Sequence, residues 1–134
     1  TELVLPYVSF NSRIIQFSSA AAFVPQPGFA VYAATKSYVL SYSKALGQEL
    51  KSRNISVTAV CPGSVETEFF DYALNGKKLP IYKKAVISRP EVVVKHAIRD
   101  SLMGKTMSVS RPVMKGFYIL CKFLPHDLIM RFIK

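Results

Sequence analysis

Residues 13–19 read RIIQFSS and residues 55–61 read ISVTAVC, and these two runs decide the fold. Each contains a short apolar segment (residues 14–18 in the first), which is typical of a buried strand in a parallel sheet. A helical pattern runs between them from residue 30 to about residue 52. Strand, helix and strand in this order predict a right-handed βαβ unit. One face of that helix carries its apolar positions: Val39, Leu40, Leu46 and Leu50.

The second half of the chain predicts further elements of an α/β fold. Residues 88–91, Ser-Arg-Pro-Glu, read as a helix start with Ser88 as the cap and the proline in the first turn. That helix should run to about Met103, where Gly104 ends it. A third strand is expected over residues 106–110. The core positions expected of the helix are Val92, Val93, Ala97, Ile98 and Leu102.

Three reactive groups would meet at one end of the βαβ unit. Tyr32 and Lys36, in VYAATK, lie four residues apart and share a helix face. Ser19 closes the first strand-like run, and Pro62-Gly63 follows the second. A phenol, an ammonium and a hydroxyl at the ends of parallel strands suit proton transfer to or from an alcohol or carbonyl oxygen. The pattern therefore indicates redox chemistry.

A dinucleotide-binding fold also needs a glycine-rich turn, and this sequence contains none. Its six glycines are too far apart to cradle a phosphate. The chain begins inside an apparent helix, residues 2–8, without a first strand. We therefore expect the second half of a larger domain.

Four motifs, taken in order, resemble the short-chain dehydrogenase/reductase family over about residues 3–107. They are Ser18-Ser19, Pro25-x-Pro27-Gly28, Tyr32-Ala-Ala-Thr-Lys36 and Val60-Cys-Pro62-Gly63-Ser-Val65-Glu-Thr67. The resemblance implies the C-terminal half of a Rossmann-like doubly wound parallel sheet. Residues 1–111 would form this part of the domain, with the dinucleotide-binding half absent, and residues 112–134 a basic, apolar helical tail.

The resemblance implies a catalytic role for each of the three groups. Tyr32 would be the general acid in reduction and the general base in oxidation. Lys36 would favour the phenolate through its charge and bind the nicotinamide ribose, and Ser19 would hold the substrate oxygen. The alternatives are a packed helix tyrosine, a solvated lysine and a plain strand-end hydroxyl. Ser18 fits the catalytic spacing less well than Ser19.

The same resemblance implies a nicotinamide cofactor and no metal. Pro62 and Gly63 would let the nicotinamide approach the backbone, while the Val65 backbone and the Thr67 hydroxyl would bind its carboxamide. The alternative is a structural turn with Thr67 capping a helix. NAD(P)(H) is expected, with NADP slightly preferred. The residues that select the adenosine ribose belong to the absent half, so the chain alone is expected to be inactive.

The expected substrate is a small apolar carbonyl or alcohol. Residues 68–87 would cover it, with Phe69, Phe70 and Tyr72 as apolar walls, although these rings could equally be ordinary core. The sequence of residues 32–46, YAATKSYVLSYSKAL, together with the extended apolar tail, resembles the branch of the family that acts on long acyl or steroid-like carbonyls. The resemblance also implies a homo-oligomer of the full-length protein, joined through the helix of residues 30–52.

The net positive charge is confined to one half of the 134-residue chain. Residues 1–71 carry five basic and five acidic side chains, whereas residues 72–134 carry thirteen and three, which accounts for the whole net charge of +10. This favours a solvated basic surface, or contact with lipid headgroups or an acidic substrate carrier, and no motif indicates nucleic acid. The tail could be an interfacial helix on an anionic membrane, or could cover a substrate pocket or a partner subunit. A non-catalytic remnant or interaction module is thus the alternative to an enzyme.

Two further features bear on the compartment. Cys61 and Cys121 lie in apolar surroundings without metal-ligand spacing, so we expect free, buried thiols in a reducing compartment, with a bridge as the alternative. The first residues lack the basic and apolar pattern of a secretory signal. A cytoplasmic protein is expected, with peripheral membrane contact as an option.

Overall fold

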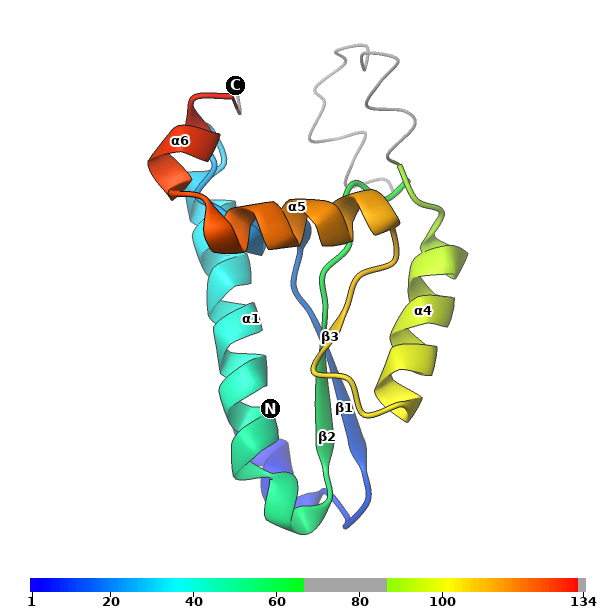
Figure 1. Cartoon of the computed structure of the whole chain (residues 1–134). Coiled ribbons are helices and arrows are strands. Elements are labelled where there is room, and N and C mark those ends of the chain that lie inside the picture. The colour runs from blue at the N-terminus through cyan, green and yellow to red at the C-terminus, as the bar shows by residue number, and fades with distance from the viewer. Residues whose placement is uncertain (67–86, 133–134) are drawn as a thin grey trace.

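The computed structural model describes residues 1–66 and 87–132 (Figure 1). Three parallel strands form one sheet there in the order β1-β2-β3, with helices on both faces, which confirms the predicted α/β fold. In chain order the elements are η1 (Glu2–Tyr7), β1 (Arg13–Phe17), η2 (Ala20–Phe23), α1 (Ala30–Glu49), η3 (Lys51–Arg53), β2 (Ser56–Val60), α4 (Pro90–Leu102), β3 (Met107–Ser108), α5 (Pro112–Phe123) and α6 (His126–Met130).

The unit β1-α1-β2 is the βαβ unit that the sequence predicts. β1 and β2 pair in parallel from Arg13 opposite Ser56 to Phe17 opposite Val60. Two positive φ angles end the connecting elements: Asn54 (φ 51°) precedes β2, and Gly104 (φ 68°) follows α4. Asparagine and glycine adopt this left-handed conformation at low cost, and the predicted stop at Gly104 is confirmed.

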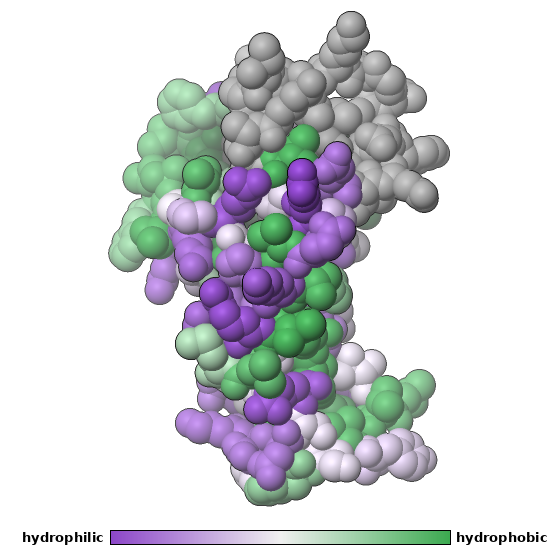
Figure 2. Space-filling view, turned by 90° about the vertical axis from the view of Figure 1, so that its right-hand side faces the viewer, coloured by the Kyte–Doolittle hydropathy of each residue, from purple (hydrophilic) through white to green (hydrophobic). Residues whose placement is uncertain are grey.

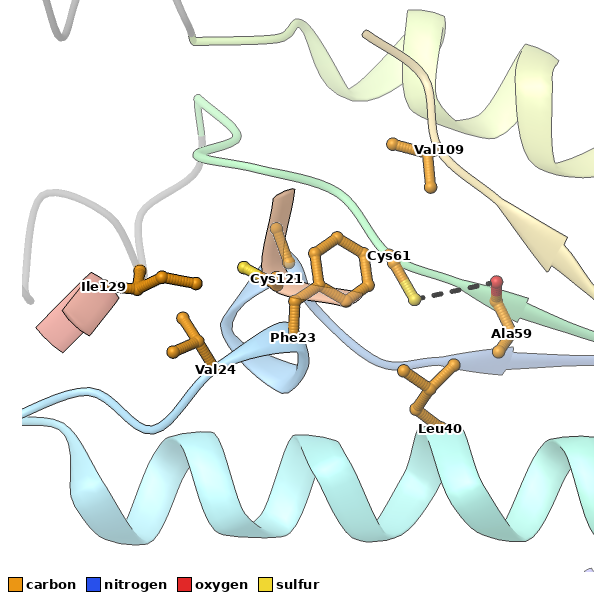
Figure 3. Close-up of a cluster of buried hydrophobic side chains, with 9 residues drawn as sticks. Phe23, Val24, Leu40, Ala59, Cys61, Val109, Cys121 and Ile129 are labelled. Carbon is orange, nitrogen blue, oxygen red and sulfur yellow. Dashed lines mark hydrogen bonds between the residues drawn. The ribbon is translucent and has the colours of Figure 1, made fainter. Parts of the chain in front are cut away.

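The main core lies on the α1 face of the sheet. Leu40 of α1, Ala59 of β2 and Phe23 of η2 pack there with Cys121 of α5 and Ile129 of α6 (Figure 3). A second cluster joins the C-terminal half of α1, through Leu46 and Leu50, to Ile55 and Val57. Cys61 and Cys121 are free and buried, as expected.

The α4 face departs from the sequence-based expectation. Val93 and Ala97 of α4 are buried, but Val92, Ile98 and Leu102 are exposed, because α4 contacts the sheet through one narrow stripe. β1 is likewise not fully buried: Ile15 and Phe17, whose side chains share the α4 face, are exposed. Figure 2, which looks onto this side, shows apolar surface between hydrophilic residues.

The start of α4 also corrects a prediction. Arg89, not Ser88, is the N-cap residue, and Pro90 is the first helical residue. Ser88 instead forms a parallel bridge with Val65, and its hydroxyl accepts a hydrogen bond from Nε of Arg111 at 3.2 Å. The helix therefore begins one residue later than a Ser88 cap would place it.

The C-terminal part agrees with its predicted elements. β3 lies within residues 106–110, and the tail is helical: α5 and α6 are two short helices separated at Pro125. Within residues 1–66 and 87–132, no helix is long and apolar enough to cross a membrane.

Candidate active site

The carboxyl end of β1 fixes Lys36 at two points. Nζ of Lys36 donates a hydrogen bond to the carbonyl oxygen of Phe17 at 3.1 Å. Oγ of Ser18 donates to the carbonyl oxygen of Lys36 at 2.7 Å. Both the ammonium and the backbone of Lys36 therefore contact the strand end.

Tyr32 lies beside this ammonium. Nζ of Lys36 is 5.7 Å from the centroid of the Tyr32 ring, within the range of a cation–π contact. The hydroxyl of Thr35 donates to the carbonyl oxygen of Tyr32 at 2.8 Å, inside the first turns of α1. The structure thus brings together the two residues that the four-residue spacing places on one helix face.

Ser19 joins β1 to the turn that follows β2. It is the N-cap of η2, where its buried Oγ accepts a hydrogen bond from the Ala21 N–H at 3.1 Å. The backbone N–H of Ala20, the residue after Ser19, donates a hydrogen bond to the Pro62 carbonyl oxygen at 2.8 Å. A serine hydroxyl that accepts one hydrogen bond keeps its proton for another acceptor, so capping is compatible with a second role.

Gly63 has a packing reason to be glycine. A Cβ atom added there would lie 3.0 Å from Sδ and 3.2 Å from Cγ of Met114 in α5. The family resemblance predicts a glycine here because a nicotinamide approaches the backbone. No pattern in the sequence indicates the contact with α5. Val65 is held through the bridge to Ser88, which uses the Ser64 carbonyl and the Glu66 N–H. Thr67, Phe69, Phe70 and Tyr72 lie outside the described residues.

Ser18 contributes more than its sequence position suggested. Its hydroxyl bonds the backbone of Lys36 and also interacts with the Cys61 thiol, so three elements meet at this one side chain. Burial raises the pKa of Cys61 to about 11, against smaller lowering effects of Ser18 and the Lys44 charge. The thiol therefore stays protonated at neutral pH. Alternation along β1 was the available signal, because it directs Ser18 towards the face that α1 covers.

A pocket of about 250 Å³ opens beside this cluster. Its walls come from η2, the following loop and the first turns of α1, with His126 of α6 at one side. Tyr32, Lys36 and Ser19 do not line it. At about 100° per residue, Tyr32 and Lys36 lie on a different side of α1 from its lining residues Ala33 and Ser37.

The chain thus forms a parallel sheet with helices on both faces and places the Tyr32 and Lys36 pair at the carboxyl end of β1. Residues 1–77 match the family model described as short chain dehydrogenase, which is more than half of the chain. The chain therefore belongs to the short-chain dehydrogenase family.

Among its relatives, the chain is similar to nodulation protein G of Rhizobium meliloti (strain 1021), with 41% identity over 110 residues. This match covers 75% of the chain and 44% of the relative. It is also similar to very-long-chain 3-oxoacyl-CoA reductase of Rattus norvegicus, with 37% identity over 103 residues, covering 74% and 30%. The chain spans less than half the length of these relatives.

The fold is shared with a solved short-chain dehydrogenase from Sphingobium yanoikuyae in complex with NADPH. The TM-score is 0.67 at 24% identity, and the match covers 87% of this chain and 44% of that one. At this identity the likeness concerns the fold alone. It supports the description of the chain as part of a Rossmann-like sheet.

Proposed function

We propose that this chain carries the proton-transfer part of an NAD(P)-dependent oxidoreductase that interconverts a carbonyl and a secondary alcohol. One observation carries the proposal: Lys36 is held by the end of β1 with its Nζ 5.7 Å from the Tyr32 ring. Membership of a dehydrogenase family supports a role of Tyr32 and Lys36 in proton transfer. The ammonium would stabilise negative charge on the phenolic oxygen when the proton leaves.

Each residue has a distinct role in the proposed reduction. Tyr32 donates its phenolic proton to the carbonyl oxygen of the substrate, and in the oxidation it takes that proton back. Lys36 orients and stabilises the tyrosine from its fixed position against Phe17. Ser19 donates its hydroxyl proton to the substrate oxygen as a hydrogen bond, while the Ala21 N–H continues to hold the same Oγ.

The residues present fit the nicotinamide end of the cofactor. The Lys36 ammonium lies at the carboxyl end of a parallel strand, where open α/β sheets bind their ligands. Lys36, Val65 and Thr67 would hold that end, and NAD(P)H, NADPH slightly favoured, supplies the hydride when bound. No two glycines of the sequence are close enough to cradle the diphosphate. We therefore expect turnover only where another segment provides this cradle, and little from the 134 residues alone.

The proposed substrate is a small apolar carbonyl compound or alcohol. Phe69, Phe70 and Tyr72 would supply its apolar surroundings. The name of the rat relative, a very-long-chain 3-oxoacyl-CoA reductase, supports a ketone on an acyl chain as the first compound to assay. Homo-oligomer formation through α1 is part of the same proposal, because Val31 and Tyr38 are strongly exposed on that helix.

Replacement of one phenol tests the proposal. In the protein in its complete natural form, Tyr32→Phe should lower kcat/KM for an apolar ketone with NADPH by about 10²–10⁴-fold, since it removes the proton donor. Tyr7→Phe is the matched control, because Tyr7 lies in η1, outside α1, and is 85% exposed. It should leave turnover within about twofold. Equal activity of the Tyr32→Phe variant and the wild type would remove the mechanism.

A further inference from the structure

Helix α5 is apolar on two opposite sides. One side, with Met114, Phe117, Tyr118 and Cys121, packs against the main core. A helix that only covers a core needs one apolar stripe and carries polar residues elsewhere. Here the other side also carries large apolar side chains, and Phe123 is 78% exposed. The exposed set on α5 is Val113, Ile119, Leu120 and Phe123.

The positions of these residues around the helix follow from its geometry. Each residue advances by about 100°, so Ile119 and Phe123 lie on the side opposite Cys121. Lys115 and Lys122 fall together on one flank, between the buried and the exposed side. Both lysines are exposed. The helix thus has an apolar outer side with a basic border.

The same character continues beyond α5. Leu124, Leu128 and Phe132 are exposed, and Phe132 is 82% exposed. Arg131 adds a further exposed cation. Residues 112–134 contain four basic side chains and a single acidic one, Asp127. We name the exposed set formed by Val113, Ile119, Leu120, Phe123, Leu124, Leu128 and Phe132 the outer tail surface.

We propose that the outer tail surface docks onto an anionic lipid bilayer, with α5 lying in the plane of the interface. The basic border identifies the occupant, because lysine and arginine beside exposed phenylalanine and leucine complement acidic headgroups over an acyl layer. The helix is 12 residues long, which suits the interface and is too short to cross the bilayer. This docking is independent of the proposed redox reaction.

A second apolar surface shows that exposure alone does not distinguish the tail. Val94 and Ile98 of α4 are 46% and 50% exposed. They belong to α4, beside the sheet, whereas α5 crosses the carboxyl ends of the strands (Figure 1). A lipid-binding role predicts that charge introduced at the outer tail surface abolishes vesicle binding, while the same change on α4 does not.

Vesicle sedimentation tests the proposal on the complete protein. Binding to phosphatidylcholine vesicles containing phosphatidylserine should exceed binding to phosphatidylcholine alone and fall as salt is added. Ile119→Asp and Phe123→Asp should each weaken it at least about tenfold, because an apolar contact is replaced by a repelled charge. Val94→Asp is the matched control and should bind like the wild type.

One double variant keeps the test decisive if an aspartate disturbs the fold. Lys115→Gln with Lys122→Gln retains every apolar residue and should weaken binding to the anionic vesicles about tenfold or more. Wild-type protein that sediments with neither kind of vesicle would overturn the proposal. So would a dimer in analytical ultracentrifugation that Ile119→Asp dissociates, since the occupant would then be a second copy of the chain.

Discussion

The two faces of the sheet differ in how completely they are covered. On the α1 face, nine buried residues from six stretches of the described chain form one continuous cluster. On the α4 face the buried apolar cluster consists of Val60, Val93 and Ala97, and Phe17 remains exposed. The side chain of Ser18 and the backbone of Lys36 meet on the well-packed face. The candidate site thus lies beside the larger apolar cluster, whereas α4 packs on the sheet through the smaller one.

The largest expected effect tests that packing difference directly. Leu46 of α1 is 2% exposed and Ile98 of α4 is 50% exposed. Leu46→Ala should lower the free energy of unfolding by about 2–5 kcal/mol, because it removes buried methyl groups and leaves a cavity. Ile98→Ala should change it by about 0.5 kcal/mol or less. Denaturant unfolding measures both, and equal losses would mean that the α4 face is packed as well as the α1 face.

The α4 face is tied to β3 by one buried carboxylate. Asp100 is 3% exposed and accepts hydrogen bonds from Nζ of Lys105 at 2.8 Å and Oγ of Ser108 at 2.7 Å. Asp100→Asn should cost about 1.5–3 kcal/mol at neutral pH, since these bonds to a charged group are lost or weakened. Asp127→Asn, at an exposed position of α6, is the control. A loss as small as that of the control would show that the tie contributes little.

This carboxylate also gives the stability a pH dependence. Burial raises the pKa of Asp100, but the hydrogen bonds from Lys105 and Ser108 and the charges of Lys105 and Arg99 lower it by more, so the net pKa is below its ordinary value. A lowered folded-state pKa stabilises the protein above the unfolded value, about 3.9, and this contribution is lost as the pH falls through the folded value. Asp100→Asn should flatten this part of the acid unfolding curve.

The smallest expected effect compares two glycines. Gly63→Ala should destabilise the protein by about 1 kcal/mol, because the new Cβ displaces Met114, whose flexible side chain can partly yield. Gly116→Ala, inside α5 with nothing within 4 Å of the added Cβ, should stabilise it by about 0.5–1 kcal/mol. In a Met114→Ala background the cost at Gly63 should vanish. The same sign at both positions would mean that α5 does not rest on this turn.

Much of the fold could be predicted from local signals. The strands, the helix between them and the stop at Gly104 follow from apolar periodicity and turn residues. The errors concern tertiary contacts. Ser88 is a favourable cap residue, but its bridge to Val65 prevails, and Ile98 and Leu102 have the period of core positions although nothing described covers them. Periodicity identifies a face, and it does not show how much of that face is covered.

The candidate site could be predicted in part for the same reason. Tyr32 and Lys36 meet because a four-residue spacing fixes their relation on a helix. The hold of Phe17 and Ser18 on Lys36, and the contact of Met114 with Gly63, depend on how separate elements pack. No single segment contains that information.

The central claim is that Tyr32 and Lys36 act as one proton-transfer unit, and a double-mutant cycle tests it most directly. Tyr32→Phe, Lys36→Met and the double variant are compared by kcat at saturating NADPH and ketone, in the complete natural protein. Each single change should lower kcat by about 10²-fold or more, and the double variant should be no slower than Tyr32→Phe alone, because Lys36 acts through the phenol. Losses that multiply in the double variant would contradict the account.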